Sequence, residues 1–156
     1  MSPVLKVRHL EKDDIPFVLK MAKDFQENSL FKNCGFDEDK VLALLDSSLN
    51  PTSPYFLMVG EVDKKIKGAF CGQVSEYYFS KKRIASDLAI YVNPEDRRFS
   101  FNFLNKAIAE FEKWAKEWEA VEVCICGSSG SYSENYEKFL KRKQYINTGF
   151  ITKKGV

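Results

Sequence analysis

The stretch that decides the fold is YVNPEDRRFSFNFLNKAI, which runs from Tyr91 to Ile108. It reads as the end of a strand, a turn at Pro94, two adjacent arginines and the start of a helix. A helix that begins near Arg98 leaves its first backbone N–H groups unpaired and carries a partial positive charge at that end. Because such amides bind anions, the stretch is either a phosphate-binding site or an ordinary strand-to-helix turn.

This candidate phosphate loop contains no glycine. Glycine usually supplies left-handed torsions and room for a close approach in such loops. If the loop bends through ordinary torsions, Ser100 can replace a glycine and add a hydroxyl donor, and Asn102 can donate its side-chain amide. Phe99 and Phe101 are then expected to turn toward the core or to flank the bound molecule.

The two arginines add charge to the loop. Arg97 and Arg98 can form charge-assisted hydrogen bonds to phosphate, preferably bidentate ones. The alternative is a solvated arginine pair whose charge is balanced by Glu95 and Asp96.

Outward from this stretch, hydrophobic periodicity and turn residues predict strands and helices in alternation. The predicted strands cover 5–10, 55–62, 66–79, 84–92 and 121–126; the predicted helices cover 14–25, 37–49, 98–118 and 132–143; a hairpin-like segment covers 144–154. Short turns between the middle strands imply antiparallel hairpins, and a strand–helix–strand unit around the arginines implies a parallel crossover. The predicted fold is therefore α/β (α+β), a mixed, mostly antiparallel sheet with helices on both faces in the order β-α-α-β-β-β-α-β-α-β-β. A single domain over residues 1–156 is expected.

Composition is that of a globular protein, with 44% apolar and 29% charged residues and a net charge of +2. That charge is too small to indicate nucleic acid or an anionic membrane as a partner. The short basic clusters 81–83 and 141–143 are expected to be solvated, so nucleic acid stays a weak alternative. No apolar run is long enough to span a bilayer and no signal peptide is present, so a cytoplasmic protein is expected.

The cysteines give little support for a metal site. Cys34, Cys71, Cys124 and Cys126 form no CxxC pair, and His9 is the only histidine. No metal is therefore expected. Cys124 and Cys126 lie on one face of a predicted strand and are expected to be small buried residues in a reducing compartment rather than a disulfide.

This element order, together with the residues around the turn, resembles the GNAT family of acetyl-coenzyme A-dependent N-acetyltransferases. The family signature V-x-P-x-x-R-[RG]-x-G-x-[GA]-x-x-L is similar to the residues Val92, Pro94, Arg97, Arg98, Ser100, Asn102 and Leu104. The ending YEKFLKRKQYINTGF resembles the helix-to-strand ending of the family, and ASDLAIYVNPEDRR is similar to a run in phage-encoded members.

The resemblance implies an enzyme that transfers an acetyl group from acetyl-CoA to an amine on a small molecule, peptide or protein. It implies that residues 88–92 splay from residues 121–126, which frees the backbone of Ile90 and Val92 to pair with the pantetheine arm. The residues that it places on the cofactor are Ile90, Tyr91, Val92, Arg97, Arg98, Phe99, Ser100, Phe101 and Asn102. A monomer or homodimer is expected.

Acetyl transfer to an amine needs a base, and Asp87 and Glu76 are the candidates. Asp87 precedes the cofactor loop and is expected on the face opposite Leu88, Ile90 and Val92. The alternative for Asp87 is a surface or ion-paired aspartate, and for Glu76 a solvated charge at a strand end.

The acid that protonates the leaving thiolate is a tyrosine on the last helix in many family members. Matching Gln144 to the glycine of the family ending puts Leu140 in that position. Tyr136 or Tyr132 is expected to substitute. The missing tyrosine and missing glycines keep a second interpretation open, a GNAT-fold module that binds CoA or a protein partner with little turnover.

Overall fold

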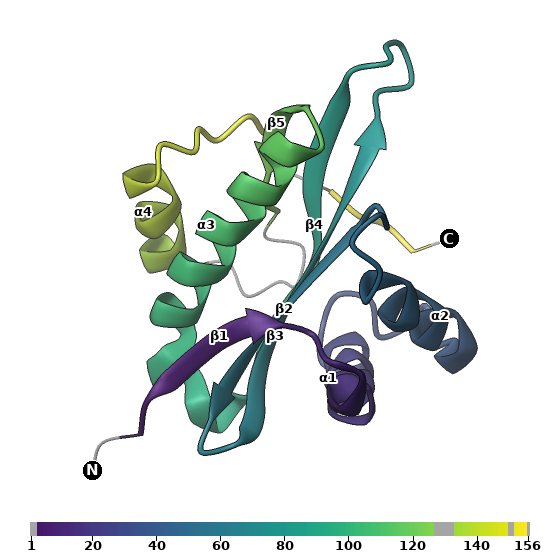
Figure 1. Cartoon of the computed structure of the whole chain (residues 1–156). Coiled ribbons are helices and arrows are strands. Elements are labelled where there is room, and N and C mark those ends of the chain that lie inside the picture. The colour runs from purple at the N-terminus through teal and green to yellow at the C-terminus, as the bar shows by residue number, and fades with distance from the viewer. Residues whose placement is uncertain (1–2, 127–132, 150–151, 156) are drawn as a thin grey trace.

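A five-stranded sheet runs through the middle of the protein in the computed structural model, which describes residues 3–126, 133–149 and 152–155 (Figure 1). The strands lie side by side in chain order: β1 (Leu5–His9), β2 (Tyr55–Val62), β3 (Lys65–Glu76), β4 (Arg83–Val92) and β5 (Ala120–Cys124). Neighbours among β1 to β4 pair antiparallel, whereas β4 and β5 pair parallel. The mixed, mostly antiparallel sheet agrees with the sequence prediction.

Helices cover both faces of this sheet (Figure 1). Two lie on one face, α1 (Ile15–Glu27) and α2 (Glu38–Ser48), and two on the other, α3 (Ser100–Glu117) and α4 (Glu134–Arg142). Short 3-10 turns precede α1 and α3, namely η1 (Lys12–Asp14) and η2 (Pro94–Phe99). Each face has its own apolar core, so the sheet is the middle of three layers.

The turn between β2 and β3 consists of two residues. Asp63 and Lys64 have φ of 49° and 61°, the left-handed values that a tight turn of the I′ kind requires. This turn fixes the register in which Val62 faces Lys65.

The longest helix, α3, lies close against the sheet because two strand positions carry no side chain. A Cβ at Gly72 would come within 2.5 Å of the Phe111 ring, and a Cβ at Gly60 would come within 2.9 Å of the Phe103 ring. Both rings are almost completely buried. The glycines that the sequence places inside strands therefore make room for aromatic rings of α3.

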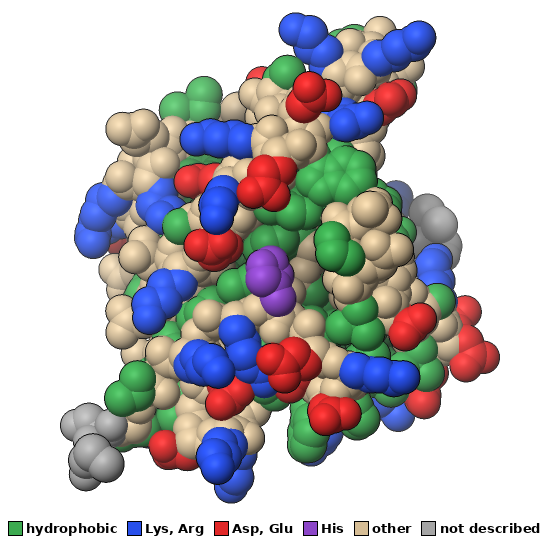
Figure 2. Space-filling view, viewed as in Figure 1, with side chains coloured by type: hydrophobic (Ala, Val, Ile, Leu, Met, Phe, Trp, Pro, Cys, Tyr) green, Lys and Arg blue, Asp and Glu red, His purple; other side chains and the backbone are tan. Residues whose placement is uncertain are grey.

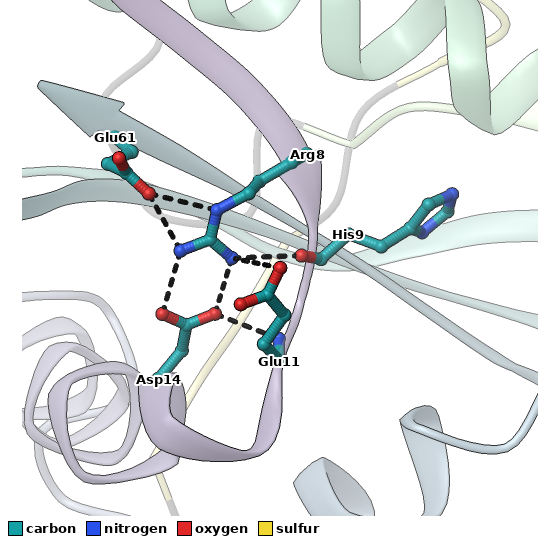
Figure 3. A network of polar contacts seen from close by, with 5 residues as sticks. All are labelled: Arg8, His9, Glu11, Asp14 and Glu61. Atoms are coloured by element: carbon teal, nitrogen blue, oxygen red, sulfur yellow. Dashed lines mark hydrogen bonds and ion pairs between the residues drawn. The ribbon is translucent and has the colours of Figure 1, made fainter. Parts of the chain in front are cut away.

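A polar network around Arg8 fixes the start of α1 to the sheet (Figure 3). The Arg8 guanidinium donates to both Asp14 carboxylate oxygens, at 2.6 and 3.0 Å, and to Glu61 of β2 at 2.9 Å. Asp14 also accepts the backbone N–H of Glu11 at 2.8 Å. The guanidinium holds the pKa of the Asp14 carboxyl below its usual value, so this carboxylate is charged at neutral pH.

The surface carries charges of both signs. Figure 2 shows lysine, arginine, aspartate and glutamate side chains interspersed over one face, with His9 near its middle. None of the helices in the described residues has the length and apolarity to cross a membrane. Those residues also bring together no three histidine, cysteine or acidic side chains suited to a metal ion.

The predicted C-terminal hairpin is wrong for the residues that the structure describes, since neither 144–149 nor 152–155 forms a strand. After α4, Gln144 takes a φ of 68° and the N–H of Tyr145 returns to the Leu140 carbonyl. The Tyr145 hydroxyl then donates to Glu112 of α3 at 2.8 Å. These contacts hold the segment on α3, and the next apolar residue, Ile146, is 82% exposed instead of facing a core.

Candidate active site

The pairing of the parallel strands β4 and β5 ends half-way along β4, where β5 itself ends. Their pairing covers only Arg83 to Ser86 of β4, which lie opposite Ala120 to Cys124. Beyond Ser86, residues 87–92 of β4 have no partner on that side within the described part of the chain. Because β5 ends at Cys124, residues 87–92 of β4 present a free backbone edge within the described residues, and the expected splay of residues 88–92 from residues 121–126 stays a prediction.

A β-bulge lies where this pairing ends. Cys71 of β3 pairs with Ala89 and the next residue, Gly72, pairs with Asp87, so Leu88 is an extra residue in β4. Such a bulge disrupts the ladder locally and leaves the extra residue unpaired.

The bulge changes the face on which Asp87 lies, so the expectation that it lies opposite Ile90 and Val92 is wrong. Its partner Gly72 faces Phe111 of α3. Ile90 and Val92 pack against the same core as Phe111. Strict alternation would have put residues 87 and 90 on opposite faces, and the extra residue restores them to one face.

The Asp87 carboxylate joins β4 to the segment that follows β5. It is 9% exposed, and its Oδ1 accepts the backbone N–H of Cys126 at 2.6 Å. Burial raises the pKa of this carboxyl to about 6, and hydrogen bonds from the Cys126 amide and from its own amide act in the opposite direction. Asp87 therefore marks the point where the pairing ends, which we call the apex, and is mostly ionised at pH 7.5.

Tyr136 reaches this apex from α4. Burial raises the pKa of its hydroxyl above the usual range, and the nearby charges of Asp87 and Cys126 raise it further. Its hydroxyl is thus protonated at neutral pH. Leu140, which occupies the position of the family tyrosine, packs against the apolar core instead. Tyr132 lies outside the described residues.

Glu76 is not part of this arrangement. It is exposed at the end of β3, where it pairs with Arg83 near the tip of the β3–β4 hairpin. It lies four positions along β3 from Gly72, the partner of Asp87, which is about 13 Å along a strand. The structure brings Asp87 and Tyr136 together and leaves Glu76 apart.

Two thiols that the sequence predicted to be small and buried also lie at the apex, where the structure leaves them half-buried. Cys124 and Cys126 are unbonded, with Sγ atoms 3.6 Å apart. Burial and the Asp87 charge raise the pKa of the Cys126 thiol to about 12. The alternation of β5 predicted that these residues share a face, but their approach to Asp87 depends on how the bulge opposite Gly72 turns Asp87, which the sequence did not predict.

The arginine pair lies at the opposite end of the free β4 edge. The helix α3 starts at Ser100 rather than near Arg98, because Pro94 to Phe99 form a 3-10 turn first. The N–H of Ser100 donates to the Arg97 carbonyl, so this amide is already used. No side chain caps α3, and its first turn holds no acidic residue.

Both guanidinium groups are available at this end. Arg97 and Arg98 are exposed, and neither has a carboxylate partner within the described residues. The balancing role expected of Asp96 is wrong: this buried residue forms an ion pair with Lys67 of β3 at 3.0 Å. Arg98 lies 4.7 Å from the centre of the Phe99 ring.

The remaining residues that were predicted to bind the cofactor lie in two different environments. Phe101 and Asn102 are exposed on the first turn of α3, and the Phe101 ring lies 5.4 Å from that of Phe139 on α4. Tyr91 packs with the core on the α1 and α2 side, so only its backbone lies along the free edge. The free edge, the apex and the arginine pair form one continuous track from residue 87 to residue 102.

No family model matches the chain, and no curated protein matches it either. Solved structures do. An aminoglycoside acetyltransferase from an uncultured soil metagenomic sample, crystallised with sisomicin, is 19% identical with a TM-score of 0.67, covering 97% of this chain and 95% of its own. The aminoglycoside acetyltransferase AAC(6')-Iy in complex with a CoA bisubstrate analogue is 14% identical with a TM-score of 0.73, covering 98% of both chains.

The chain has the GNAT fold. Glucosamine-6-phosphate N-acetyltransferase from Arabidopsis thaliana adds to this likeness, at 13% identity and a TM-score of 0.69 over 97% of this chain and 98% of its own. At these identities the comparisons establish the GNAT fold alone. The narrower likeness to phage-encoded members stays a prediction.

Proposed function

We propose that this GNAT-fold protein is an N-acetyltransferase that moves the acetyl group of acetyl-CoA to an amine. The observation that carries the proposal is the free backbone edge of β4 beyond the end of β5, with a buried carboxylate where the pairing ends. Structures of AAC(6')-Iy with CoA and with a CoA bisubstrate analogue give support by likeness of fold.

The track from residue 87 to residue 102 suits the shape and charge of acetyl-CoA. The backbone of Ile90 and Val92 is expected to pair with the amides of the pantetheine arm, as an added strand pairs with a sheet edge. Arg97 and Arg98, with the hydroxyl of Ser100 and the amide of Asn102, are expected to bind the pyrophosphate. Six residues of β4 reach about 20 Å from this end to the apex, where the thioester would lie.

Asp87 is proposed as the base. Its position at the apex and its pKa of about 6 fit a carboxylate that takes a proton from an acceptor amine near neutral pH. The proton leaves the attacking nitrogen, directly or through one water, as the nitrogen bonds to the thioester carbon. The unpaired backbone at Leu88 is proposed to stabilise the oxyanion that forms on the carbonyl.

Tyr136 is proposed as the group that stabilises the leaving sulfur. Its hydroxyl is protonated and close enough to Asp87 and Cys126 for their charges to raise its pKa. It can donate a hydrogen bond to the thiolate of CoA as the carbon–sulfur bond breaks. The acceptor amine is carried by a small molecule, a peptide or a protein.

Calorimetric titration with acetyl-CoA tests the proposal. Wild type is expected to bind, and Arg97→Ala with Arg98→Ala is expected to weaken binding by about 1.5–3 kcal/mol for each charge-assisted bond lost. Lys113→Ala, an exposed cation elsewhere on α3, serves as the matched control and is expected to bind like wild type. Absence of binding to wild type would overturn the proposal.

One observation favours a second candidate, a GNAT-fold module that binds CoA with little turnover. Leu140, which occupies the usual tyrosine position, packs against the apolar core and has no hydroxyl. A screen for CoA thiol release over amines and peptides separates the two candidates. Binding with release supports the enzyme, and binding without release from any acceptor supports the module.

A further inference from the structure

We propose that Cys124 and Cys126 form a thiol pair that reduces the disulfide of CoA when that disulfide is bound along β4, with Cys126 as the attacking thiol and Cys124 as the resolving thiol. This inference rests on the proposed function, because it needs the pantetheine arm to reach the apex. It adds thiol–disulfide exchange to acetyl transfer at the same site.

The geometry of the two thiols carries the inference. The strand β5 ends at Cys124, so Cys126 lies beyond the regular ladder. The Sγ atoms face each other at 3.6 Å, and an approach of about 1.5 Å would bring them to bonding distance.

Their place in the fold identifies the substrate class. Cys126 donates its backbone N–H to Asp87 at the apex where the pairing of β4 and β5 ends. A pantetheine arm that follows β4 from the arginine pair would place its sulfur at this apex. The molecule that presents a reactive sulfur to Cys126 is therefore a thioester, thiol or disulfide of CoA.

The exchange balances in two steps. The Cys126 thiol loses its proton and attacks one sulfur of the CoA disulfide; a mixed disulfide forms and one CoA leaves as a thiolate, which takes up that proton. The Cys124 thiol then attacks the Cys126 sulfur, the second CoA leaves as a thiol, and a Cys124–Cys126 disulfide remains. Two protein thiols are oxidised, and one CoA disulfide is reduced to two CoA thiols.

The surroundings make the pair selective for a bound disulfide. A thiol whose pKa is about 12 attacks a dissolved disulfide roughly a hundredfold more slowly at neutral pH than an ordinary thiol, even allowing for its greater nucleophilicity. A disulfide held at this site reacts as an intramolecular partner, and that gain can exceed the loss by several orders of magnitude. Free disulfides from solution, such as that of glutathione, lack this advantage.

Cys34 provides an internal control, because it is exposed and remote in sequence from the β4–β5 apex. It is expected to react with dissolved disulfides of any kind at similar rates. Selectivity at Cys126 but not at Cys34 would thus reflect the site and not the reagent.

The test treats reduced wild type, Cys124→Ser and Cys126→Ser with CoA disulfide or glutathione disulfide and follows intact mass and peptide maps. Wild type is expected to form the Cys124–Cys126 disulfide. Cys124→Ser is expected to accumulate one CoA adduct on Cys126, at least about tenfold faster than the glutathione adduct, and reduced CoA is expected to slow this reaction. Cys126→Ser is expected to show modification of Cys34 only.

Failure of the inference is distinguishable from failure of the proposed function by calorimetry of reduced Cys124→Ser with CoA. If CoA binds but no Cys126 adduct forms, or if both disulfides modify Cys126 equally fast, the thiol-pair inference is overturned alone. If CoA does not bind, the proposed function is overturned and this inference with it.

Discussion

The carboxylate of Asp87 and the backbone amide of Cys126 join β4 and β5 at 2.6 Å, just past the last regular pair of the two strands. This contact lies where the β4–β5 pairing ends and the free backbone edge of β4 begins. It holds the candidate base against the segment that follows β5.

Asp87→Asn is expected to lower acetyl transfer by about 10²–10⁴-fold while acetyl-CoA still binds, because the amide oxygen can accept the Cys126 N–H but cannot take a proton. In wild type the rate is expected to rise with pH through about 6 as this carboxyl ionises. Steady-state kinetics over pH 5–9 checks both statements. An unchanged pH profile in the variant would remove Asp87 from the role of base.

Tyr136→Phe is expected to lower kcat about tenfold or more with little change in KM for acetyl-CoA, since the hydrogen bond to the leaving sulfur forms mainly in the transition state. Tyr78→Phe is the matched control, because Tyr78 is fully exposed near the tip of the β3–β4 hairpin. Equal kcat values for the two variants would contradict a role for Tyr136.

Gly72→Ala is expected to destabilise the fold by about 1–3 kcal/mol, because the new Cβ would lie 2.5 Å from the buried Phe111 ring. Gly155→Ala has no neighbour within 4 Å of the new atom and is the control. Denaturant unfolding of both proteins measures the difference. Equal midpoints would mean that α3 does not pack as closely on the sheet as described.

Arg8→Met is expected to destabilise the fold by about 2–3 kcal/mol at pH 7, because it leaves the half-buried carboxylates of Asp14 and Glu61 without their cation. The folded pKa of Asp14 lies below its unfolded value near 3.8, so this stabilisation is present above about pH 4 and is lost as the pH falls below it.

Chemical unfolding at pH 7, 5 and 3 checks the Arg8 prediction. The stability gap between wild type and Arg8→Met should narrow at pH 3, whereas Lys12→Met, an exposed cation in η1, should show little gap at any pH. A gap that widens toward acid would contradict the assignment of this network.

The sequence predicts all five strands of the sheet and its mostly antiparallel order, because alternating apolar residues and short turns are local signals. Local signals of this sort also predict the tight turn at Asp63 and Lys64 and the amphipathic face of α3. The β2–β3 register next to its turn follows from this local signal, whereas the bulge between β3 and β4 and the pairings of β1 and β5 involve segments far apart in the sequence.

What the sequence could not predict depends on contacts between distant segments. Gly72 inside a strand indicates a bulge or a close backbone approach, but it does not tell that β4 gains the extra residue, Leu88, which decides the face on which Asp87 lies. The 3-10 turn before α3 is held by Asp96 pairing with Lys67, a residue of another strand. The failure of the C-terminal hairpin likewise follows from Tyr145 bonding to Glu112 rather than from the apolar pattern of the segment.

The buried carboxylate of Asp87 lowers the stability of the folded protein at the same time as it supplies the proposed base. Its pKa of about 6 exceeds the value of an unfolded aspartate, so the folded state loses stability as the pH rises from about 4 through 6. Selection for thermal resistance alone at neutral pH would therefore favour neutral residues at this position. Variants selected in that way would be more stable but would lack the carboxylate that is proposed as the base.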